Sequence, residues 1–131
     1  MKFMVCYEDT STSRDTVRLA QKHAAVWNAE IVIVSTITRE EPIKHSRLQA
    51  REDAFEAQIR DLFEDVELPY NTQLLVDSRT TGEQLIRHAV RKKVDLIFLG
   101  IKKRSKVGKL LFGSTVQYVI LNAPCPVLTT G

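Results

Sequence analysis

Short, uninterrupted apolar runs that alternate with helical patterns are the feature of this sequence that most constrains its fold. Such a run is typical of a strand that helices cover on both faces, as in a parallel sheet. Between the runs, apolar residues recur at the three- and four-residue spacing of amphipathic helices. The pattern predicts an α/β fold with a doubly wound, mostly parallel sheet. We expect five strands, at residues 3–7, 31–34, 71–77, 94–99 and 124–128.

Four helices are expected between these strands, and hydroxyl residues mark three of their starts. Thr12 is one of several candidate caps for the first helix, and an acidic residue follows it three positions later. The second helix is expected at about 44–64. Thr80 and Glu83 have the spacing of a capping box, and Ser114 begins a similar pattern. We therefore expect Thr80 and Ser114 to cap the third and fourth helices.

Length and cysteine use indicate one domain in a reducing compartment. A chain of 131 residues can bury a core without disulfides or metals. Its two cysteines, Cys6 and Cys125, lie far apart in apolar runs and lack CxxC spacing. No window reaches the roughly 18 apolar residues of a membrane span. We expect a single domain, residues 1–131, located in the cytoplasm and without membrane contact.

The charge distribution is more informative than the net charge. A net charge of +3 is too small to indicate nucleic-acid binding by itself. Five cations crowd into residues 102–109, a stretch without the aromatic residues that would stack on bases. A nucleic-acid partner is therefore not expected. A solvated basic loop and an anion site are both compatible with this run.

A ligand site is expected where the winding of the sheet reverses. In a sheet ordered 3-2-1-4-5, the crevice lies beyond the carboxyl ends of the first and fourth strands. Its rims would be residues 8–13 and 100–115, and the second rim combines cations, glycines and a helix start. Free amides at a helix start attract anions such as phosphate. The candidate binding residues are Glu8, Asp9, Thr36, Gly100, Lys102, Lys103, Gly113, Ser114 and Thr115.

A purely structural interpretation of these residues stays open. Gly113 would then only allow close packing, Ser114 would only cap its helix, and the lysines would only solvate the loop. His23, His45 and His88 fall on three predicted helices without ligand spacing such as HExxH, so we assign no metal site. Because no GxSxG turn surrounds Ser114, we assign no catalytic residue either.

The carboxyl-terminal third closely resembles the signature end of universal stress proteins. The resemblance rests on DLIFLGIKKRSKVGKLLFGSTVQYVILNAPCPVL and extends over nearly the whole chain, including residues 7–20 and 81–86. It implies a Rossmann-like fold of the adenine nucleotide alpha hydrolase type, with helices on both faces of a parallel sheet ordered 3-2-1-4-5. It also implies a stress-response homodimer that pairs through the last strand, here the edge from Val127 to Thr129.

The ATP motif of the family is incomplete here. In ATP-binding members a glycine, two residues, a second glycine and nine residues precede a glycine with serine or threonine. The pattern maps onto Gly100, Gly113 and Ser114, but Lys103 replaces the middle glycine. Glu8 takes the place of the usual aspartate after the first strand, and the adenine-side position falls near Thr36. The resemblance thus implies ATP as a candidate ligand, with magnesium only alongside a bound nucleotide.

Two functional classes follow. The first is a binding module that holds an adenine nucleotide, or once did, and acts through unknown protein partners. The second is an enzyme that hydrolyses a nucleotide or transfers a nucleotidyl group in the same crevice. We expect the first, because no catalytic constellation accompanies the predicted crevice.

Overall fold

The computed structural model describes residues 1–101 and 113–131. It contains one sheet of five parallel strands in the order β3-β2-β1-β4-β5, as predicted. The strands are β1 (Lys2–Cys6), β2 (Glu30–Thr38), β3 (Tyr70–Asp77), β4 (Leu96–Gly100) and β5 (Val127–Thr130). The helices are α1 (Ser11–Trp27), α2 (His45–Leu62), α3 (Thr81–Lys92) and α4 (Ser114–Asn122).

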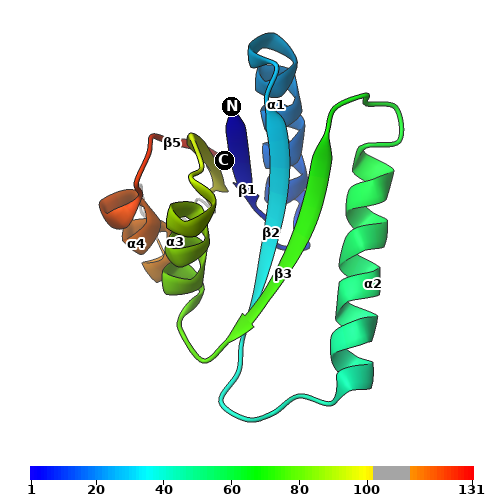
Figure 1. Cartoon of the computed structure of the whole chain (residues 1–131), viewed down its shortest axis with the longest axis vertical. Helices are drawn as coiled ribbons and strands as arrows, with labels where there is room; N and C mark the ends of the chain where they lie inside the picture. The colour runs from blue at the N-terminus through cyan, green and yellow to red at the C-terminus, as the bar shows by residue number, and fades with distance from the viewer. Residues whose placement is uncertain (102–112) are drawn as a thin grey trace, which may run out of the picture.

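Helices cover both faces of the sheet, which explains why β1, the first part of β2 and β4 are apolar without alternation. Figure 1 shows α1 and α2 on one face and α3 and α4 on the other. Along β1, Phe3 and Val5 join the core under α1 and α2, while Met4 and Cys6 join the core under α3 and α4. Successive strand side chains point to opposite faces, so a strand buried on both sides has no polar position to offer.

Helix α3 begins as its sequence predicts. Thr80 is the N-cap, its hydroxyl accepts from the Glu83 amide, and the Glu83 carboxylate accepts from the Thr80 amide. Both halves of the capping box are therefore formed. The cap fixes the point at which the chain leaves β3 and enters α3.

Of the candidate caps for α1, Thr10 is the N-cap, because its hydroxyl accepts from the Ser13 amide at 3.1 Å, whereas Thr12 lies inside the helix. The capping role predicted for Ser114 is wrong. Helix α4 does begin at Ser114, but Gly113 is its N-cap, and no side-chain hydrogen bond caps the helix. Spacing alone cannot separate a cap from the first helical residue, because that choice depends on where the chain changes from extended to helical backbone.

No helix among the described residues is long and apolar enough to cross a membrane.

Candidate functional site

A crevice with a volume of about 490 Å³ lies at the carboxyl ends of β1, β2 and β4. The starts of α1, α3 and α4 complete its walls. It occupies the switch point of the sheet, where β1 lies between β2 and β4 and the winding reverses. Its described lining is Cys6–Thr10, Thr12, Ser13, Val34–Thr36, Arg51, Thr81, Leu85, Leu99, Gly100 and Gly113–Val116.

The structure brings together most of the residues that the sequence singled out. Glu8, Asp9, Thr36, Gly100, Gly113, Ser114 and Thr115 all line this one crevice. The end of β4 and the start of α4 therefore lie beside the loop that follows β1, as the predicted site requires. Lys102 and Lys103 lie outside the described residues.

The loop after β1 is held in place by its own hydrogen bonds. The Glu8 amide donates to Ser13 Oγ at 3.0 Å, which ties the loop to the first turn of α1. Both carboxylates of this loop are exposed, and Asp9 Oδ1 forms an ion pair with Arg14 at 3.0 Å. No described side chain forms an ion pair with Glu8, so Glu8 is the freer carboxylate of the two.

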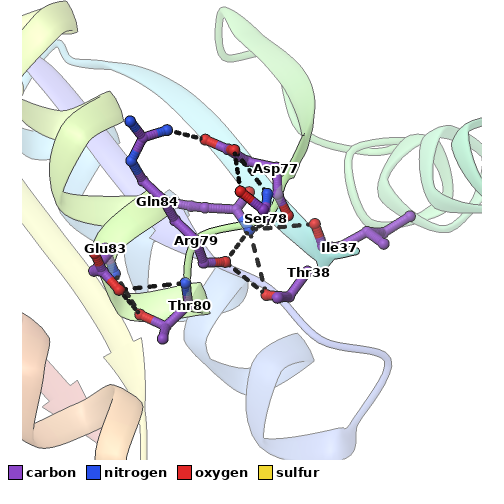
Figure 2. A network of polar contacts seen from close by, with 8 residues as sticks. All are labelled: Ile37, Thr38, Asp77, Ser78, Arg79, Thr80, Glu83 and Gln84. Carbon is purple, nitrogen blue, oxygen red and sulfur yellow. Dashed lines mark hydrogen bonds and ion pairs between the residues drawn. The ribbon is translucent and has the colours of Figure 1, made fainter. Parts of the chain in front are cut away.

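The opposite wall is built from Val34–Thr36 of β2 and from Thr81 and Leu85 of α3. Thr36 Oγ1 donates to Thr81 Oγ1 at 3.2 Å, so two lining hydroxyls are linked across 45 residues of sequence. Behind them, the buried Gln84 amide donates to the Ile37 carbonyl at 3.2 Å and the Arg79 carbonyl at 2.9 Å (Figure 2). One side chain thus fastens the ends of two strands to α3.

An ion pair closes the turn beside that wall (Figure 2). The Arg79 guanidinium and the Ser78 amide both donate to the Asp77 carboxylate, and they hold the pKa of that carboxyl below its usual value. Asp77 is therefore ionised at neutral pH, and its charge is already matched by Arg79.

Packing within the described chain explains the motif glycine at position 100 but not the one at position 113. A Cβ on Gly100 would lie 2.9 Å from Thr12 Cγ2 and 3.0 Å from Thr16 Oγ1, so close packing of α1 on β4 explains this glycine. A Cβ on Gly113 would meet no described atom within 4 Å, and its φ of −66° suits any residue. Neither packing nor backbone conformation within the described chain requires glycine at 113.

The start of α4 presents backbone amides that no side-chain cap satisfies. The first four amides of a helix have no partner within the helix. With Gly113 at the N-cap, no side-chain oxygen accepts from these amides in the described chain. Because Gly113, Ser114 and Thr115 line the crevice, this positive end of the helix faces it.

The thiol in the crevice is not poised for chemistry. Burial raises the pKa of Cys6 to about 12, so the nucleophilic thiolate is absent at neutral pH. In residues 1–101 and 113–131, no three histidine, cysteine or acidic side chains gather as a metal site would require.

Sequence reasoning missed Arg51 and Thr81, which also line the crevice. Thr81 directly follows the predicted cap Thr80, so its place could have been inferred. Arg51 precedes Phe55 by one helical turn, and Phe55 is buried against the sheet, so helical spacing was the available signal.

The fold and the crevice define the class of the protein: a doubly wound α/β domain with a ligand-sized hollow at its switch point. A family model described as the universal stress protein family matches residues 1–130. The chain therefore belongs to the universal stress protein family.

Individual relatives agree with this assignment. A universal stress protein of Thermus aquaticus is 26% identical over 130 residues, which cover 95% of this chain and 94% of that protein. The fold matches a universal stress protein structure from Archaeoglobus fulgidus with a TM-score of 0.84, 22% identity, and coverage of 98% of this chain and 97% of that one.

Two further solved structures of similar fold are nucleotide complexes. An Archaeoglobus fulgidus universal stress protein in complex with dAMP has a TM-score of 0.80 and 18% identity, over 98% of this chain and 96% of that one. A universal stress protein in complex with cAMP has a TM-score of 0.81 and 19% identity, over 100% and 97%.

Proposed function

We propose that this chain is a homodimeric stress-response module that binds an adenine nucleotide in the crevice between β1 and β4. ATP is the candidate ligand, and signalling passes through protein partners in the cytoplasm. The observation that carries the proposal is the start of α4, where amides without a side-chain cap border the crevice. No atom of the described residues lies within 4 Å of a Cβ built on Gly113 beside these amides.

The nucleotide complexes of the two structural relatives, with dAMP and with cAMP, support the choice of adenine nucleotides. In the proposed arrangement, the phosphates lie against Gly113, Ser114 and Thr115. Thr36 and the loop with Glu8 and Asp9 lie on the nucleoside side. A metal ion has a role only if a triphosphate binds, with Glu8 and Asp9 as its candidate ligands.

Lys103 is the departure that bears most on affinity. Where the family motif has glycine, a side chain costs about 1–2 kcal/mol if the backbone must be left-handed. An ammonium about 4 Å from a phosphate charge contributes about 4 kcal/mol before desolvation at an effective dielectric of 20. The charge therefore compensates for the glycine in the proposed complex.

The decisive experiment identifies the nucleotide that the protein carries. The freshly purified protein is denatured, and released nucleotides are separated and identified by mass spectrometry. In parallel, the protein without ligand is titrated with ATP, AMP and cAMP, with and without magnesium. A ligand at 100 times its dissociation constant adds about 2.7 kcal/mol to the free energy of unfolding.

We expect binding without turnover. Magnesium-dependent release of ADP or pyrophosphate that Lys103→Ala abolishes would instead establish the enzymatic alternative. A protein that releases no nucleotide and gains no stability from any of the three compounds would refute the proposed site.

A further inference from the structure

Arg51 is the one basic side chain that lines the crevice among residues 1–101 and 113–131. It belongs to α2, and the orientation of that helix is fixed a few residues later. Phe55 and Ile59 are buried against the sheet, and Gln58 Oε1 accepts a hydrogen bond from the Tyr7 hydroxyl at 3.1 Å. The rings of Tyr7 and Phe55 stack with their centres 5.7 Å apart. Arg51 lies one turn before Phe55, so it shares the face that is turned to the sheet.

The guanidinium of Arg51 has no acidic partner. It forms no ion pair or hydrogen bond with any described residue, and the side chain is exposed. One turn earlier, Arg47 joins Arg51 in lining an adjacent apolar hollow with Ile37, Ile43 and Leu48. Two like charges four residues apart destabilise a helix by a few tenths of a kcal/mol. The positive charge on this face is therefore not explained by stabilisation of α2.

The crevice has a second positive wall on its other side. Helix α2 covers one face of the sheet and α4 covers the other (Figure 1). Arg51 approaches the crevice from the first face, and the free amides at the start of α4 approach it from the second. A ligand between them meets positive potential at two separate places.

We propose that Arg51 binds a second anionic group of the ligand, so that the crevice selects adenine nucleotides with two separated phosphate groups. This inference rests on the proposed function and narrows its ligand class, because ATP carries its phosphates in one chain and a nucleotide with two separated phosphate groups should bind more tightly. The first phosphate lies at the start of α4, and the second meets the guanidinium of Arg51. A planar guanidinium offers two parallel donors to a phosphate, which an ammonium cannot reproduce.

The test compares AMP with adenosine 3′,5′-bisphosphate by calorimetric titration at one fixed ionic strength. We expect the wild-type protein to bind the bisphosphate about ten- to a hundred-fold more tightly than AMP, the gain of one charge-assisted contact. Arg51→Gln removes this preference, because it weakens binding of the bisphosphate much more than binding of AMP. Arg51→Lys keeps the positive charge but loses the two parallel donors of the guanidinium. It should therefore retain part of the preference for the bisphosphate over AMP.

Arg47→Gln is the matched control, because it removes the same charge from the same helix and Arg47 does not line the crevice. It should keep the full preference. Equal weakening of both nucleotides by Arg51→Gln, or equal effects of the two glutamine variants, would overturn the inference. If AMP binds and the bisphosphate binds no better, the inference fails and the proposed function stands. If neither binds, both fail.

Discussion

At the scale of single residues, His88 is a buried titratable side chain that should make the stability of the fold depend on pH. It is 2% exposed, and neither ring nitrogen has a hydrogen-bond partner within the described chain. Burial lowers the pKa of His88 from its ordinary value, and the nearby charges of Arg91, Lys92 and Lys2 lower it further. The folded protein therefore holds this imidazole neutral, whereas the unfolded chain protonates it near pH 6.5.

The sign of the pH dependence follows from that difference. Above about pH 6.5 both states are neutral at His88, and the full stability is present. As the pH falls below this value, His88 binds a proton in the unfolded state but stays neutral in the folded state. The free energy of unfolding therefore decreases by up to about 1.4 kcal/mol per pH unit. Urea unfolding between pH 8 and pH 5 measures this slope.

His88→Leu should reduce the slope, since no group titrates at that position. Equal slopes for the wild-type protein and His88→Leu would mean that other groups dominate its acid sensitivity.

Gly113 allows stability and ligand binding to be separated. Serine is a better N-cap than glycine by a few tenths of a kcal/mol, and a Cβ at position 113 would meet no atom of residues 1–101 and 113–131 within 4 Å. Gly113→Ser should therefore raise the free energy of unfolding slightly. Its hydroxyl would accept from the same amides that the proposed phosphate uses, so ATP affinity should fall about tenfold or more. Chemical denaturation and calorimetry test the two effects independently, and a variant that binds ATP as well as the wild type contradicts the proposed phosphate position.

At the scale of elements, α3 and α4 pack so closely that Gly82 cannot be replaced by a larger residue without a steric clash. A Cβ on Gly82 would lie 2.9 Å from Tyr118 Cβ and 2.9 Å from Tyr118 Cδ1. Gly82→Ala should therefore force the helices apart and destabilise the protein by about 1–3 kcal/mol. Because Thr81 and the start of α4 both line the crevice, nucleotide affinity should fall as well.

Thermal and urea unfolding measure the cost of Gly82→Ala. Arg87→Ala, at an exposed position of the same helix, provides the reference and should stay within about 0.5 kcal/mol of the wild type. A Gly82→Ala protein as stable as this reference would show that α4 shifts without cost.

The elements also show what could be read from the sequence. The apolar runs predicted β1, β2 and β4 because burial on both faces leaves a continuous signal, and Thr80 with Glu83 predicted the start of α3. The length of β2 could not be predicted, since its last residues are only partly buried and pair with β3 through backbone groups. Helical spacing from Phe55 assigns Arg51 to the face of α2 that is turned to the sheet, but its position in the crevice depends on how α2 docks on the sheet, which is a long-range contact.

At the scale of the whole molecule, the free edge of β5 determines how two copies would meet. The carbonyls of Pro126 and Thr130 accept from Ile97 and Ile101, so these positions turn their backbone groups toward β4 and its end. Backbone direction alternates along a strand, and therefore Val127 and Thr129 turn their N–H and C=O groups to the open edge. The proposed homodimer uses these groups for pairing.

Thr129→Pro tests the proposed dimer without removing a hydrogen bond inside the sheet. Proline is tolerated at the free side of an edge strand, where it deletes an outward N–H. Each dimer loses two such donors, so the dissociation constant should rise about 5- to 150-fold, measured by sedimentation equilibrium. Thr130→Pro acts on the inner side, where Thr130 Oγ1 also contacts Thr16 Oγ1 at 2.6 Å, and should destabilise the fold itself. A wild-type protein that remains monomeric at high concentration, or a Thr129→Pro protein that dimerises as tightly as the wild type, would show that β5 is not the interface.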